Sequence, residues 1–383
     1  MIYLDNAATT FPKPTGVILA VNEMSRRCAN PGRSGYKLSL NASETVFDCR
    51  QNAADFFNLK DVEKCILTPS CTVSLNTVIY GVLKKGDHVV ISSLEHNSVL
   101  RPIKRLSDMG IITYDVAEVF ERDDDKTLDS FRKCMNNKTQ LLICTHASNV
   151  FGIKLPVKRI AALCKFYGVL FCVDSAQTAG VVPIDIDDIG ADFFCIPGHK
   201  GLYGPMGTGL LLINTDKIPD SLYQGGTGSS TLDYNEPMIL PDKFESGTIN
   251  LTGFAGLSKG IKFVKEKSPK NIYNHEMKLI RKLYMNLKTI KKVELYTEIP
   301  DTEHYVPLLS FNIKDKDADI VGNILDKKFG ICVRSGFHCS PLAHKYMGTE
   351  ERGTVRVCPS VFTTVKDIDN LINAVYMISS DKK

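Results

Sequence analysis

Short, almost uninterrupted apolar runs recur between residues 65 and 213 and alternate with stretches of helical spacing. Each run ends at Gly or at polar residues. The six runs are 65–68, 88–92, 140–145, 169–174, 193–196 and 209–213. Strands that are apolar on both sides belong to a sheet buried on both faces, and such sheets are largely parallel with helical crossovers. This pattern predicts an α/β fold with a mostly parallel central sheet.

Several helices are also marked in the sequence. Residues 155–167 have helical spacing, begin near a proline and stop at Gly168. The lysine-rich amphipathic stretch at 262–292 is predicted to be helical, and residues 318–329 and 365–378 predict two further helices. Between these segments the chain has short alternating runs that are typical of strands.

A chain of 383 residues is long for a single core, so we expect two domains. Near residue 263 the alternation of apolar runs and helical stretches gives way to a lysine-rich helical stretch followed by short alternating strands. We therefore predict a large domain of residues 16–262 and a smaller α+β domain formed by residues 1–15 and 263–383.

Charge and cysteine usage exclude several classes of protein. The net charge of +4 comes from 47 basic and 43 acidic residues, which is too balanced to indicate nucleic-acid binding. No stretch is apolar for long enough to predict a membrane helix, and the first residues do not resemble a secretory signal. The twelve cysteines are scattered, so we expect reduced thiols, a cytoplasmic protein and no metal site.

The glycine-rich segment 198–209 is the most informative stretch, because a buried strand opens into it and it carries His199 and Lys200. Ligand sites of open α/β sheets lie at the carboxyl ends of strands. A desolvated lysine there has a lowered pKa and forms an imine with an aldehyde. Taken alone, Lys200 is more often a surface lysine on a turn.

A carboxylate stands in the corresponding place on the preceding strand. Asp174 ends the run 169–174, and Gln177 follows three residues later. A carboxylate at this place can pair with a protonated pyridine nitrogen and make the ring an electron sink, while Gln177 can contact the phenolic oxygen. The alternative for Asp174 is an ordinary turn or helix-cap residue.

Two further pieces suit a phosphorylated aromatic cofactor. Ser70, Cys71 and Thr72 stand where a strand passes into a helix, and helix starts bind anions through backbone N–H groups and hydroxyls. The alternative is a plain helix cap. His96 follows another strand, where an imidazole can stack on a pyridine ring and move protons.

In this combination the sequence resembles a known family almost from end to end. It is similar to the class V aminotransferase group of fold-type I pyridoxal-phosphate (PLP) enzymes, and within it to the cysteine desulfurase and selenocysteine lyase branch. The matching motifs are YLDNAATT at 3–10, EH at 95–96, THASNV at 145–150, VDSAQ at 173–177, GHK at 198–200, FESGT at 244–248 and VRSGFHC at 333–339.

The resemblance implies roles around the cofactor. Lys200 would hold PLP as a Schiff base, and His96 would stack on its ring. Asp174 would contact the ring nitrogen and Gln177 the ring oxygen. His199 would join the helix start in binding the phosphate.

The resemblance also implies substrate contacts and a homodimer with shared sites. Thr248 would reach the phosphate bound by the neighbouring subunit. Arg356 would clamp the substrate carboxylate as a rigid fork, with Asn149 beside it. Arg334, Asn6 and Tyr36 are further candidates for substrate binding.

Cys339 distinguishes the desulfurase branch. In that branch a loop cysteine attacks the sulfur of bound cysteine and becomes a persulfide. The attack needs a thiolate, which we expect neighbouring His338 and Arg334 to favour electrostatically. The alternative is an inert buried cysteine, as for most of the other eleven.

The sequence therefore predicts a PLP-dependent cysteine desulfurase that converts L-cysteine to L-alanine and passes sulfur to an acceptor protein. Selenocysteine lyase, another β-elimination or transamination remains open, because a fold does not determine the reaction. A non-catalytic scaffold or sulfur-carrier partner is the alternative from another class. Pro197 and Tyr36 depart from the family pattern, which often has serine and histidine at these places.

Overall fold

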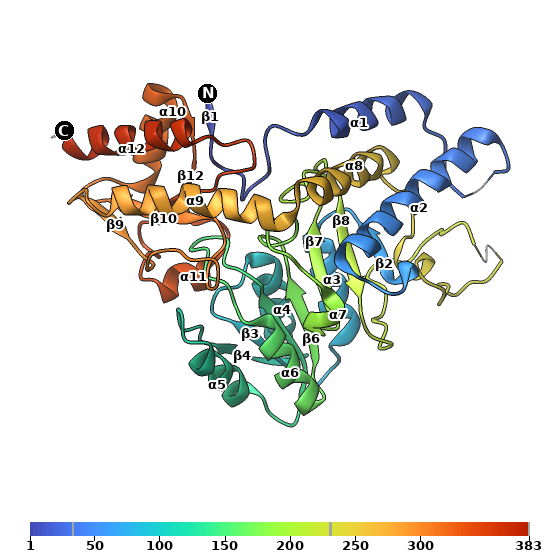
Figure 1. Cartoon of the computed structure of the whole chain (residues 1–383). Coiled ribbons are helices and arrows are strands. Elements are labelled where there is room, and N and C mark those ends of the chain that lie inside the picture. Colours follow the sequence, from blue (N-terminus) through green and yellow to red (C-terminus); the bar gives the residue numbers. More distant parts are fainter. Residues whose placement is uncertain (33, 230–231, 382–383) are drawn as a thin grey trace.

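The predicted apolar runs form most of a seven-stranded sheet in the computed structural model, which describes residues 1–32, 34–229 and 232–381 (Figure 1). Its strands are β2 (Cys65–Thr68), β3 (His88–Ser92), β4 (Thr113–Ala117), β5 (Thr139–Thr145), β6 (Leu170–Asp174), β7 (Phe193–Pro197) and β8 (Gly209–Ile213). The order across the sheet is β2-β8-β7-β6-β5-β3-β4. Only β8 runs antiparallel to its neighbours, so the mostly parallel sheet is confirmed.

Both faces of this sheet are buried, as the apolar runs predict. Along β5, Leu142 and Cys144 pack into one core cluster, whereas Leu141 and Ile143 pack into the other. Helices α3 (Cys71–Val82) and α4 (Asn97–Asp108) cover one face. The opposite face is covered by α2 (Lys37–Phe57), α5 (Asp124–Cys134), α6 (Val157–Tyr167), α7 (Ile186–Ile189) and α8 (Leu251–Lys267), and α1 (Thr15–Arg27) packs on α8.

Helix boundaries agree with the sequence at some places and differ at others. Gly168 ends α6 with a left-handed φ of 69°, as a stop signal should. The helical stretch predicted at 262–292 is mostly helical but is divided between two helices, because the chain breaks at Ser268 between α8 and α9 (Pro269–Leu287). Pro269 lacks an N–H and therefore starts a helix more readily than it continues one.

The C-terminal part builds a second, antiparallel sheet with its own core. The order in this sheet is β12-β13-β10-β9, and its strands are β9 (Val293–Leu295), β10 (Leu309–Ile313), β12 (Arg334–Gly336) and β13 (Thr354–Val357). Its helices are α10 (Ala318–Phe329), α11 (Pro341–Tyr346) and α12 (Val365–Ser380). The short strand β1 (Ile2–Tyr3) pairs with β11 (Ile331–Cys332), which joins the N-terminus to this part.

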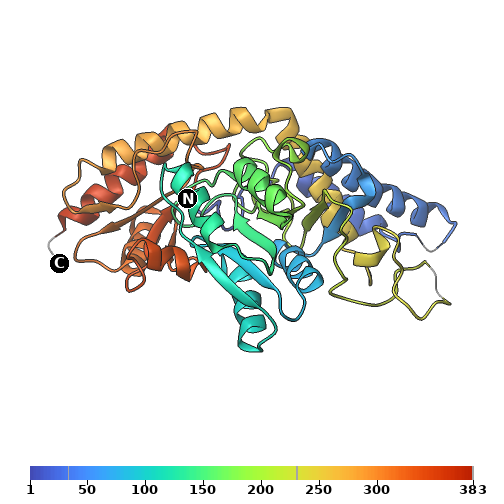
Figure 2. The same ribbon diagram turned by 90° about the horizontal axis from the view of Figure 1, so that it is seen from below.

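The long helix α9 spans the two sheets along one side of the molecule (Figure 2). Its first turns contribute Tyr273 and Met277 to the core of the large sheet, and its later turns contribute Ile280 and Leu283 to the core of the small sheet. The domain division at residue 263 stays a prediction, because one helix serves both cores.

Candidate active site

Two neighbouring parallel strands bring Asp174 and Lys200 to the same edge of the large sheet. β6 ends at Asp174, which is in register with Cys195 on β7, and β7 ends just before the loop that carries Lys200. This loop packs closely on the chain beneath it. A Cβ added to Gly201 would lie 2.3 Å from the carbonyl oxygen of Ala179, so only glycine fits there.

The amine of Lys200 is set up as a nucleophile. Within the described part of the chain its Nζ has no hydrogen-bond partner, and it lies largely inside the protein. Burial lowers the pKa of the Lys200 amine, the negative charge of Asp174 opposes that shift, and Arg356 adds to it. A lysine with a lowered pKa has more of the neutral amine that attacks an aldehyde.

Asp174 leaves one carboxylate oxygen for a ligand. Its Oδ1 accepts a hydrogen bond from the Ala176 N–H at 2.9 Å and from the Cys71 thiol at 3.5 Å. Its Oδ2 has no partner among the described residues. Burial raises the pKa of the Asp174 carboxyl, while the Ala176 N–H and Lys200 oppose the shift. A cationic N–H donor is therefore the partner that this site lacks.

His96 caps α4 and is uncharged. Its Nδ1 accepts the Ser98 backbone N–H at 3.1 Å, so the proton of the neutral ring lies on Nε2. Burial and then the charge of Lys200 lower the pKa of His96 to about 4. Gln177 donates a hydrogen bond to the Ala7 carbonyl oxygen at 3.3 Å.

At the start of α3, the side chains predicted to bind phosphate are partly engaged elsewhere. The Ser70 hydroxyl accepts the Val73 N–H at 3.3 Å and thus caps the helix, and the Cys71 thiol faces Asp174. Thr72 is exposed, and the helix N-terminus stays open to an anion. His199 is half-buried, its Nδ1 has no partner among the described residues, and burial lowers its pKa to about 4.

Arg356 is 1% exposed, and two hydrogen bonds hold its guanidinium in place. Its Nη2 contacts Asp5 Oδ1 at 2.8 Å, and its Nη1 donates to the Asn149 carbonyl oxygen at 2.8 Å. Its Nε has no partner among the described residues. Burial lowers the pKa of the Arg356 guanidinium, which Asp5 opposes. The arrangement orients a cation that still has a free N–H to offer.

Cys339 presents an exposed thiol next to one cation. Arg334 Nη2 lies 3.8 Å from Cys339 Sγ. The expected help from His338 is wrong. Its ring is 3% exposed, its Nε2 donates to the Thr354 carbonyl oxygen at 3.0 Å, and burial lowers its pKa to about 2. His338 is therefore neutral, and among the described residues Arg334 is the cation beside the Cys339 thiol.

Of the remaining candidates, Asn6, Tyr36 and Thr248, one lies in the cavity that Lys200 lines and two lie outside it. Asn6 and Lys200 line one cavity. The Asn6 side chain already has partners there, because its Nδ2 donates to the Cys358 carbonyl oxygen at 2.9 Å and its Oδ1 accepts the Phe11 N–H at 3.1 Å. Tyr36 stands at the start of α2, 52% exposed, and does not line that cavity. Thr248 lies on an exposed loop outside it. Within one chain, Asn6 therefore lies at the site with Lys200, whereas Tyr36 and Thr248 do not.

The model of the aminotransferase class-V family matches residues 2–371. The chain belongs to the class V aminotransferase family. It is 36% identical to a probable cysteine desulfurase of Methanothermobacter thermautotrophicus over 97% of this chain and 92% of that protein. It is 30% identical to a cysteine desulfurase of Wigglesworthia glossinidia brevipalpis over 99% and 92% of the two chains. It is also similar to the apo structure of cysteine desulfurase from Thermococcus onnurineus NA1, with a TM-score of 0.91 and 29% identity. The superposition covers 99% of this chain and 94% of the Thermococcus chain.

This member of the class V aminotransferase family therefore has the fold of the fold-type I enzymes, and its family depends on PLP. Its residues fit that cofactor. The amine of Lys200 and Oδ2 of Asp174, which have no partner among the described residues, suit an aldehyde and a pyridinium N–H, and the N-terminus of α3 suits a phosphate.

Sequence reasoning missed two residues that the structure places at the site. Asp5 pairs with Arg356 across a separation of 351 residues. It stands inside the YLDNAATT motif, which was the available signal. Glu276 lies between Ile272 and Ile280 on the buried face of α9. The spacing of four residues between them could have indicated that Glu276 is buried.

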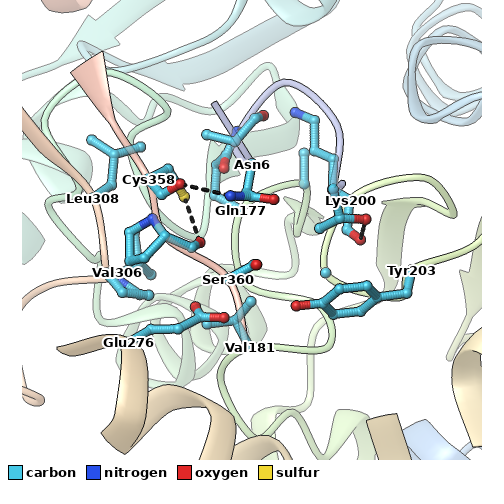
Figure 3. Close-up of a pocket in the computed structure, with 16 residues that line it drawn as sticks. Asn6, Gln177, Val181, Lys200, Tyr203, Glu276, Val306, Leu308, Cys358 and Ser360 are labelled. Carbon is cyan, nitrogen blue, oxygen red and sulfur yellow. Dashed lines mark hydrogen bonds between the residues drawn. The ribbon is translucent and has the colours of Figure 1, made fainter. Parts of the chain in front are cut away.

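Glu276 faces a cavity of about 30 Å³ that also touches Lys200 and Gln177 (Figure 3). Glu276 and Tyr203 point into this space from opposite sides, with Ser360 between them. The Glu276 carboxyl is 3% exposed and has no hydrogen bond within the described part of the chain. Burial raises its pKa well above the usual range, so the folded protein holds it as a neutral acid.

Glu276→Gln is expected to stabilise the protein increasingly as pH rises. Above the ordinary carboxyl pKa of 4.5 the unfolded chain loses the Glu276 proton while the folded chain keeps it, so wild-type stability falls up to the folded pKa. One such group changes the free energy of unfolding by about 1.4 kcal/mol per pH unit. Urea unfolding of both proteins from pH 5 to 8 measures the difference. The exposed Glu266→Gln serves as control, and a difference independent of pH would contradict the neutral acid.

Proposed function

We propose that this chain is a PLP-dependent cysteine desulfurase that converts L-cysteine to L-alanine and keeps the sulfur as a persulfide on Cys339. The placement of Cys339 carries the proposal. Its thiol is exposed beside Arg334, and its carbonyl oxygen accepts a hydrogen bond at 2.8 Å from the N–H of Asn97, the residue after His96. The nucleophile is thus tied to the edge of the cofactor site. Similarity over nearly the whole chain to proteins named cysteine desulfurase supports the same reaction.

The cofactor would be held by groups that line the carboxyl edge of the large sheet. Lys200 would attach it, Asp174 would accept the ring N–H, and His96 and Gln177 would lie against the ring and its oxygen. The N-terminus of α3, with Thr72 and with His199 Nδ1, which has no partner in the described part of the chain, would bind the phosphate. When bound, PLP supplies an electron sink that weakens bonds at the substrate α-carbon.

The substrate carboxylate would bind to Arg356, whose orientation Asp5 holds. The thiolate of Cys339 attacks the substrate sulfur, so an S–S bond forms as the C–S bond breaks. The released carbon takes up the proton that the substrate thiol gives up and becomes the methyl group of alanine, and His96, which is next to Asn97 in the chain at this turn, would relay that proton. The carbon is reduced and the sulfur oxidised, so no outside oxidant enters the balance.

The proposal includes a homodimer, a sulfur acceptor and a compartment. Exposed Thr248 would complete the phosphate site of the partner subunit, and an acceptor protein would remove the persulfide sulfur from exposed Cys339. All twelve cysteines are free, which fits a reducing cytoplasm. Among the helices of the described ranges, none has the length and apolar character needed to cross a membrane.

Product analysis tests the proposed reaction. Purified protein loaded with PLP is incubated with L-cysteine and, separately, with L-selenocysteine. We expect equal amounts of alanine and protein-bound persulfide from cysteine in a single turnover. A keto acid with ammonia would show elimination or transamination instead. Alanine from selenocysteine alone would assign a selenocysteine lyase.

A further inference from the structure

The turn that carries Cys339 has an unusual backbone. His338 and Cys339 both adopt left-handed conformations, with φ values of 49° and 60°. Two consecutive residues other than glycine in this region are strained and persist only when their surroundings hold them. The flanking side chains are buried, His338 at 3% and Ser340 at 0% exposure, whereas the Cys339 thiol points outward. The turn thus anchors its neighbours and presents the thiol.

The side chain of Asn149 spans this turn. Its Nδ2 donates to the His338 carbonyl oxygen at 2.7 Å, and its Oδ1 accepts the Ser340 hydroxyl at 2.6 Å. One amide therefore binds the residue before Cys339 and the residue after it. Asn149 is 9% exposed, so both bonds are shielded from water and hold the turn more firmly than surface bonds would.

The same residue connects the turn to the predicted carboxylate site. The backbone carbonyl oxygen of Asn149 accepts Arg356 Nη1 at 2.8 Å. The ring of His338 is also anchored at Thr354, two residues before Arg356 on β13. Asn149 thus binds Arg356 through its backbone carbonyl oxygen and binds the Cys339 turn through its side chain.

We propose that Asn149 and Ser340 are positioning residues that clamp the strained Cys339 turn in register with Arg356. The inference rests on the proposed function, because it treats Cys339 as the nucleophile. It assigns the Asn149 side chain to the turn, whereas the family resemblance placed it near the substrate carboxylate. The two assignments predict different kinetics.

Ser340→Ala and Asn149→Asp break the clamp at different points. The first removes the hydroxyl donor to Asn149, and the second removes the amide donor to His338. Ser335→Ala is the matched control, because the Ser335 hydroxyl bonds Asp319 at 2.7 Å on neighbouring β12 and does not touch the turn. If Asn149→Asp fails to fold, Ser340→Ala still tests the clamp.

Hydrogen–deuterium exchange of the PLP-loaded protein without substrate measures the clamp directly. The Asn97 N–H, which donates to the Cys339 carbonyl oxygen, and the amides of residues 336–341 are expected to exchange about tenfold faster in both clamp variants and unchanged in Ser335→Ala. Unchanged exchange in both clamp variants would overturn the proposal. This result does not depend on turnover, so it is separate from a failure of the desulfurase assignment.

Steady-state kinetics separates positioning from substrate binding. Loss of positioning lowers kcat for alanine formation, by about tenfold, and leaves KM for L-cysteine nearly unchanged. A raised KM with unchanged kcat in Asn149→Asp would show that Asn149 binds the carboxylate, and it would overturn the clamp.

Discussion

Lys200→Ala is expected to form no alanine from L-cysteine, with a loss of at least about 10³-fold, because it removes the covalent attachment and a proton-transfer group together. Lys200 is the buried lysine at the carboxyl edge of the large sheet, with a lowered pKa and Asp174 close by. The variant should also lack the absorbance band of lysine-bound cofactor. Borohydride reduction followed by peptide mass analysis should find the cofactor mass on the Lys200 peptide of the wild type only.

Lys154→Ala is a matched control for this experiment. Lys154 is half-buried and also has a lowered pKa, but its Nζ donates to the Thr302 carbonyl oxygen at 3.0 Å, away from Asp174. It should keep the cofactor band and most of the activity. A Lys200→Ala protein that turns over cysteine within tenfold of wild type would contradict the assignment of Lys200.

Cys339→Ser is expected to bind cofactor and cysteine but to release no sulfur. A hydroxyl is too weak an acid to supply the nucleophile at neutral pH, so persulfide should be absent and alanine formation should fall by at least about 10³-fold. The spectrum should still change when L-cysteine is added, because Lys200, Asp174 and Arg356 are intact. Mass spectrometry of the protein after a single turnover measures the added sulfur.

Cys332→Ser controls for the loss of another thiol in the same part of the fold. Cys332 is a half-buried free cysteine on β11, and its replacement should leave persulfide formation intact. Persulfide formation that persists in Cys339→Ser and disappears in Cys332→Ser would move the nucleophile to Cys332.

Much of the framework follows from local sequence patterns. The apolar runs at 88–92 and 209–213 match β3 and β8, and the segment 318–329 matches α10. The run at 113–117 was not predicted, because β4 is an edge strand whose side chains are largely exposed and its apolar pattern is correspondingly weak. At the break between α8 and α9, amphipathic spacing continued across Ser268 although the backbone did not.

Side-chain partners at the site were less accessible to sequence reasoning. His338 was expected to be a cation near Cys339, but burial against Thr354 makes it neutral. Cys71 was assigned to phosphate from its place at a helix start, yet its thiol turns to Asp174. Both assignments used the position of a residue along the chain, which does not reveal what its side chain meets.

The sequence by itself determined the α/β class, the parallel sheet and the placement of Lys200 and Asp174 at neighbouring strand ends, because periodicity and strand order act over short stretches of chain. Only the tertiary structure decided that Asp5 orients Arg356, that Asn149 holds the Cys339 turn and that Glu276 faces the cavity beside Lys200. These contacts join residues separated by up to 351 positions, and their geometry depends on how the two sheets pack together.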